Sequence, residues 1–111
     1  MPYDEKTADR VRRALFGRPG LEEKKMMGGV CFMVGGHMIC GVTRSELLLR
    51  VGRDAYAESL AQPHVRPMEM RGRPMSGFVL IDPPGFRTSA ALAKWIKRGL
   101  DFVTTLPSKD K

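Results

Sequence analysis

The chain has 111 residues, of which 42% belong to the apolar set AVILMFWYC and 28% are charged. This length is typical of one domain, and the composition is that of a globular protein rather than a disordered chain. Lysine and arginine outnumber aspartate and glutamate by 19 to 12, so the formal net charge is +7. No apolar run approaches the roughly 18 residues of a membrane helix, and the acidic start MPYDEKTADR is not a signal peptide. We therefore expect one cytoplasmic domain, 1–111, ordered over about 3–106, with no membrane partner.

Three segments have the pattern of helices. In the first, apolar residues recur at i, i+3 and i+4, Asp4 can cap the start, and Gly17 can end the helix in a left-handed conformation. Pro63 stops the second helix, and Pro107 ends the third, which has one continuous apolar stripe. The predicted helices are 4–16, 55–61 and 89–105.

Alternating or fully apolar runs between the helices predict strands. Gly35 and Gly36 separate two apolar runs and predict a tight hairpin turn, because glycine accepts the positive φ that such turns require. The run ELLLRV is apolar on both faces, which predicts a central strand. The predicted strands are 22–27, 30–34, 37–42, 46–51, 65–70 and 77–81.

The element order is α-β(3–4)-α-β(2)-α. It lacks the regular strand–helix alternation of a parallel sheet, so we predict an α+β fold with two layers, in which the helices pack on one face of an antiparallel sheet. The other face must be solvated or covered by a partner. Because strands 30–34 and 46–51 are apolar on both faces, we expect self-association, as a two-fold homodimer.

The two cysteines lie on the two strands of the predicted hairpin. Counting outward from a two-residue turn at Gly35 and Gly36 places Cys31 directly opposite Cys40, on the same face of the sheet. The prediction is therefore a cross-strand thiol pair within disulfide reach. In a reducing cytoplasm both cysteines should remain free thiols that serve as small apolar residues.

The sequence shows no catalytic constellation. Neither cysteine follows a helix N-terminus that would lower its pKa, and His64 has no partner nearby in the sequence. No paired carboxylates of the glycosidase type, no Walker loop and no G-x-G-x-x-G motif occur, and the cysteines and histidines lack the spacing of a zinc site. We expect no enzyme activity, no cofactor and no metal site.

Two features indicate a binding surface. The first is four basic residues at turns and strand ends, where long side chains stay in solvent: Lys24, Lys25, Arg71 and Arg73. They are the candidate contact with a polyanion or an acidic partner, although a merely solvated basic surface explains the same pattern. The second feature is seven internal methionines, which suit either an adaptable binding surface or gap filling in a core. Met68 and Met70 are predicted to share one strand face.

Three segments of the chain resemble a known family. They are EKKMMGGVCFMVGGHMICGV at 23–42, LLLRVG at 47–52 and RGRPMSGFVLID at 71–82. Their order and spacing resemble the N-terminal domain of the TfoX/Sxy family, in which a glycine-turned hairpin is followed by a Leu-x-Leu-Arg strand and an Arg-Pro-Met segment opens the last strand. The resemblance extends over about 3–106.

The resemblance implies a secretion-chaperone-like α-β(3)-α-β(2)-α arrangement and provides no catalytic residues. Named members of the family regulate natural competence together with a cyclic-AMP receptor protein, and they have a C-terminal domain that we expect to be missing from this chain. The resemblance therefore implies a non-enzymatic regulatory or protein-interaction domain, with the transcription machinery or a regulator as partner. Direct nucleic-acid binding through the basic surface is the alternative.

Overall fold

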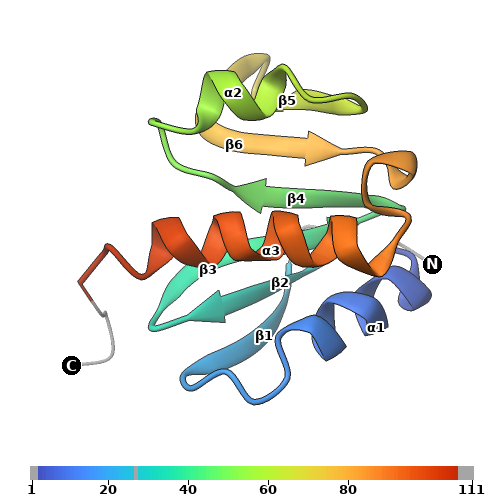
Figure 1. Ribbon diagram of the computed structural model, residues 1–111, viewed down its shortest axis with the longest axis vertical. Coiled ribbons are helices and arrows are strands. Elements are labelled where there is room, and N and C mark those ends of the chain that lie inside the picture. The colour runs from blue at the N-terminus through green and yellow to red at the C-terminus, as the bar shows by residue number, and fades with distance from the viewer. Residues whose placement is uncertain (1–2, 27, 108–111) are drawn as a thin grey trace.

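A six-stranded antiparallel sheet forms one layer of the computed structural model, which describes residues 3–26 and 28–107 (Figure 1). Its strand order is β1-β2-β3-β4-β6-β5. The strands are β1 (Leu21–Met26), β2 (Gly29–Val34), β3 (His37–Thr43), β4 (Glu46–Arg50), β5 (Val65–Met70) and β6 (Arg73–Ile81). All six predicted strands are confirmed, and residue 27 of the first predicted range lies outside the described residues. The run of three leucines does form a central strand, β4, between β3 and β6.

Three α-helices form the second layer, so the predicted α+β fold is confirmed. They are α1 (Glu5–Ala14), α2 (Tyr56–Leu60) and α3 (Ser89–Val103), and a 3-10 helix, η1 (Pro83–Phe86), precedes α3. The Asp4 carboxylate accepts the Thr7 N–H at the start of α1, and the Thr88 hydroxyl oxygen accepts the Ala91 N–H at the start of α3. In Figure 1, α3 crosses in front of the central strands, with α1 beside it.

One core lies between the sheet and the helices. The helix α3 packs closely on the sheet because its Gly99 has no side chain: a Cβ there would lie 2.9 Å from Leu49 Cδ1. The largest side chains that are completely buried in this core are Phe32, Phe86, Leu15, Ile39, Leu47, Leu49 and Ile81. The described helices therefore cover one face of the sheet and leave its other face open.

The hairpin between β2 and β3 has the predicted turn, with φ of 61° at Gly35 and 83° at Gly36. The predicted pairing of Cys31 with Cys40 is wrong. A bulge inserts one extra residue of β3, Ile39, and shifts the register beyond it. The pairs are then Met33–Met38, Phe32–Cys40 and Cys31–Gly41.

The bulge also separates the two thiols. Since side chains alternate along a strand, Cys40, next to Gly41, lies on the opposite face from Cys31. Cys40 belongs to the core beneath the helices, together with the bulged Ile39. Burial raises the pKa of both thiols. Both are free thiols, as expected, but they do not form a cross-strand pair.

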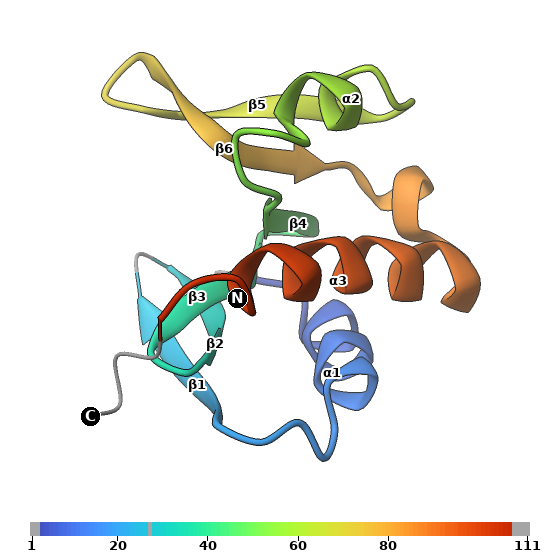
Figure 2. The same cartoon turned by 60° about the vertical axis from the view of Figure 1, so that its left-hand side comes forward.

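The hairpin of β5 and β6 bends out of the regular sheet. Its register shifts between Pro67 and Glu69, and Gly77 has a φ of 91°. The Gly77 carbonyl accepts the N–H groups of Val51 and Gly52 at 2.8 and 3.1 Å, which fixes the bend to the end of β4. Figure 2 shows the tip of this hairpin projecting beyond the neighbouring strands. At the tip, Arg71 and Gly72 form a two-residue turn, so β6 begins at Arg73, earlier than the predicted 77.

Candidate functional site

The face of the sheet away from the helices has a hollow with a volume of about 340 Å³. We call it the methionine groove. The groove lies on the face of the sheet opposite the helices. Leu48 lines it, whereas Leu47 and Leu49, which point to the other face, are buried in the core under the helices. The side chains that line the groove are Cys31, Met38, Thr43, Leu48, Met68, Met70, Met75 and Phe78. The glycines Gly29 and Gly41 and the core residues Val30 and Val42 complete its lining.

A missing side chain creates the hollow at the centre of the sheet. Gly41 lies opposite Leu48 on one side and Cys31 on the other. A Cβ at this position would lie 3.4 Å from Cys31 Sγ and 3.5 Å from Met38 Cε. The neighbouring side chains therefore form walls around a site where the backbone itself is the floor.

The bent β5–β6 hairpin supplies one wall of the groove. Met68 and Met70 of β5 do share a face, as predicted, and Met75 of β6 joins them. The Met70 side chain is 42% exposed. Unbranched thioether side chains can adjust to the shape of an apolar group placed against them. Of the two interpretations of the methionines, the adaptable surface therefore fits these three.

The structure divides the four predicted basic contact residues by face. Lys24 pairs with Cys31 and lies on the groove side of the edge strand β1, whereas Lys25 pairs with the core residue Val30 and lies on the other side. Arg73 pairs with Met70, so it shares the face of a groove methionine, and Arg71 lies in the turn beside it. All four are exposed, and within residues 3–26 and 28–107 none of them takes part in an ion pair.

The sequence prediction missed one further cation that borders the groove, Arg50. Arg50 pairs with Phe78 across β4 and β6, and its guanidinium lies 5.5 Å from the Phe78 ring centre and 5.3 Å from that of Phe102. The signal was present in the sequence, because Arg50 follows Leu48 by two residues and so shares its face.

Glu22, Glu46 and Asp82 lie on the same face, and the last two share one cation. Arg66 of β5 lies 2.8 Å from carboxylate oxygens of both Glu46 and Asp82. This guanidinium holds the pKa of Asp82 below its usual value. Along this face Glu46 and Asp82 are therefore paired, whereas Glu22 and the cations Lys24, Arg71 and Arg73 form no ion pair with any described residue.

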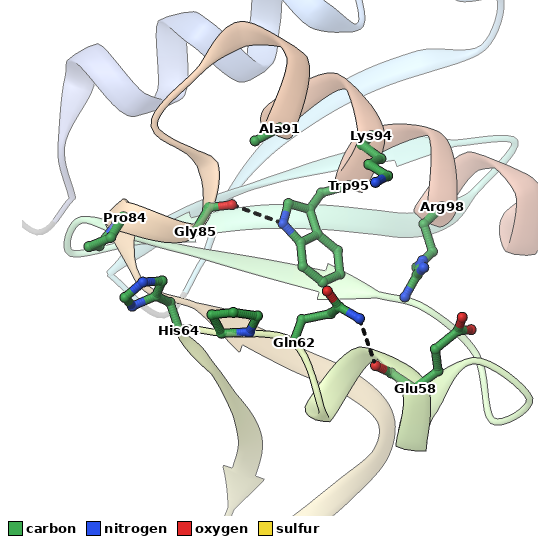
Figure 3. Close-up of a pocket in the computed structure, with 10 residues that line it drawn as sticks. Glu58, Gln62, His64, Pro84, Gly85, Ala91, Lys94, Trp95 and Arg98 are labelled. Carbon is green, nitrogen blue, oxygen red and sulfur yellow. Dashed lines mark hydrogen bonds between the residues drawn. The ribbon is translucent and has the colours of Figure 1, made fainter.

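A second, polar cleft of about 570 Å³ lies between α2, η1 and α3 (Figure 3). The Trp95 indole N–H donates to the Gly85 carbonyl at 3.1 Å. The Arg98 guanidinium lies over the Trp95 ring and donates to the buried Ser59 hydroxyl at 2.7 Å. Figure 3 shows Trp95 between Gly85 and Arg98, so the central groups of this cleft join α3 to η1 and α2. We therefore regard the cleft as structural.

A family comparison decides which kind of domain has this groove. The model of the TfoX N-terminal domain matches residues 13–103. The chain belongs to the TfoX N-terminal domain family. The match includes every strand and all the residues that line the methionine groove, and a comparison with curated proteins finds no match.

This TfoX N-terminal domain shows no activated nucleophile among its described residues. Both cysteine thiols have a raised pKa, and His37 is buried with its Nε2 2.6 Å from the Pro107 carbonyl oxygen. No three His, Cys, Asp or Glu residues within 3–26 and 28–107 come together as metal ligands would. In the same ranges no helix has the length and apolarity needed to cross a bilayer.

Proposed function

We propose that this TfoX N-terminal domain is a non-enzymatic regulatory domain that binds another protein through the methionine groove. One observation carries the proposal: the centre of the sheet face opposite the helices is apolar and hollowed rather than polar and flat. A solvated sheet face normally has polar residues in alternation with the buried ones. Exposed apolar surface with adaptable side chains is typical of a site that a partner covers.

The edges of the sheet favour the face as the docking site. Edge strands can bind a partner by adding a strand, unless charge or proline prevents it. The edge strand β1 has four consecutive exposed charged residues at 22–25, and the other edge strand, β5, contains Pro67. Strand addition is therefore disfavoured at both edges.

Direct nucleic-acid binding is the second candidate function. The free cations Lys24, Arg71 and Arg73 favour it, since contacts with phosphates require unpaired lysine and arginine. We propose the protein partner first because the groove between these cations is apolar, whereas a phosphate backbone would leave it uncovered. By family resemblance, the expected partner is a regulator or part of the transcription machinery.

A capture experiment tests the proposal. Tagged chain would be incubated with nuclease-treated native lysate, and the retained proteins would be identified and quantified by mass spectrometry. We expect at least one protein that the wild type retains and that the triple variant Met68→Gln, Met70→Gln, Met75→Gln loses about tenfold, because three apolar contacts become polar.

The matched control is Phe16→Gln. Phe16 is 89% exposed, more than any other large apolar side chain whose burial the structure describes, and it does not line the groove. This variant should retain the partner as well as the wild type does. A set of captured proteins that is identical for the wild type and the triple variant, or that disappears with nuclease, would contradict the proposal.

A further inference from the structure

We infer that the segment of the partner seated in the methionine groove is acidic and amphipathic, with apolar anchor residues flanked by carboxylates. This inference rests on the proposed function and specifies the chemistry of the partner. It follows from two features of the same surface, namely what fills the groove and what borders it.

The groove itself selects apolar anchors. Its walls are methionine, leucine and phenylalanine side chains, and its floor at Gly41 is backbone that already pairs within the sheet. A polar anchor placed there would lose its water without gaining a partner, which is unfavourable. An apolar anchor gains contact with side chains that can adapt to its shape.

The border selects negative charge. Lys24, Arg71 and Arg73 are exposed and form no ion pair with the residues that the structure describes, and Arg50 lies against Phe78 at the groove. The carboxylates on this face compensate these four cations only in part. Glu46 and Asp82 share Arg66, which leaves that group with a charge of −1, and Glu22 adds one further negative charge. Carboxylates on either side of the anchors would therefore meet unpaired cations, and a basic segment would be repelled.

A second copy of the chain fits this surface less well than an acidic segment does. Each copy has a net charge of +7, and a two-fold interface through the groove would bring the cations of one copy toward those of the other. Single-stranded nucleic acid fits less well too. Phe78 is the one aromatic side chain in the described lining of the groove, whereas such sites stack successive bases on several aromatic rings.

A random 12-residue peptide library displayed on phage tests the inference, with the full chain immobilised as bait. Selected peptides should combine leucine, methionine or phenylalanine with an excess of aspartate and glutamate. Synthetic copies should bind about tenfold more weakly to Lys24→Gln, Arg71→Gln, Arg73→Gln, because three weak ion pairs are lost together. Their affinity for the wild type should also fall as salt concentration rises.

A second charge variant is the matched control. Arg13→Gln, Arg18→Gln, Lys94→Gln removes three exposed cations that do not border the groove and reaches the same net charge. Its affinity should stay within about twofold of the wild type, because only long-range attraction is lost. Unchanged circular dichroism and thermal midpoints would establish that both variants fold.

The possible failures can be distinguished. Selected peptides without an acidic excess, or equal weakening by both charge variants, would overturn the inference while leaving the groove as a docking site. Peptides that bind the triple methionine variant as tightly as the wild type would overturn the proposed function as well.

Displacement of the peptides by a 20-base-pair DNA duplex would indicate nucleic acid as the occupant. A species of twice the chain's mass in sedimentation, lost in the triple methionine variant, would indicate a second copy. Either occupant overturns the inference.

Discussion

Phe32→Ala is expected to lower the free energy of unfolding by about 4 kcal/mol, because it leaves a large cavity in the core. The Phe32 ring is completely buried beneath the helices and is one of the largest side chains there. The neighbouring substitution Met33→Ala removes a half-buried side chain from the other face of the same strand, and its expected cost is about 1 kcal/mol. The two substitutions thus compare the two faces of β2 at adjacent positions.

Urea denaturation followed by circular dichroism measures this difference. A loss at Met33 as large as that at Phe32 would contradict the assignment of one buried face and one open face to the sheet. It would mean that the open face is packed in the isolated chain and that no partner is needed to cover it.

Gly52→Ala is expected to lower the free energy of unfolding by about 3 kcal/mol, the sum of a strained backbone and a collision. Gly52 has a φ of 84°, and a Cβ there would lie 2.7 Å from Phe102 Cε1. The ring cannot withdraw freely, because the Arg50 guanidinium lies over it. The substitution therefore forces apart the end of β4 and the last turn of α3.

Gly17→Ala is the matched control, because Gly17 has the same φ of 84° and nothing lies within 4 Å of its Cβ position. The expected cost is about 1 kcal/mol, which is the backbone term alone. Any gain from a less flexible unfolded chain is common to both substitutions and cancels in the comparison. Thermal unfolding of the two variants side by side would show the difference, and equal midpoints would contradict the contact between Gly52 and Phe102.

The helices and strands could be predicted because their signals are local. Apolar periodicity gave the segments, and residues such as Asp4, Gly35 and Gly36 marked where they start or turn. The fold class followed from the order of the elements. These features depend on residues within a few positions of one another, so a single sequence contains them.

The cysteine register could not be predicted in the same way. The bulge at Ile39 places two consecutive residues of β3 in the core, and it is favoured by packing against helices distant in the chain. Counting outward from the turn assumes a regular ladder, so it fails at the first extra residue.

The groove was predictable only in part. Alternation correctly placed Met68 and Met70 on one face, and it could also have placed Arg50 beside Leu48. The bend at Gly77 brings the hairpin methionines to the groove, and the sequence shows only a glycine there. For the same reason Lys24 and Lys25 appeared as one basic pair, although their registers place them on opposite faces.

The most direct test of the methionine groove as a protein-docking site is a spectrum of the chain labelled with ¹³C in its methionine methyl groups. On addition of the strongest selected peptide, we predict large shifts for the methyl groups of Met38, Met68, Met70 and Met75, because the anchors would lie against them. Unchanged methyl signals at these four positions, with the peptide shown to be bound, would contradict the account.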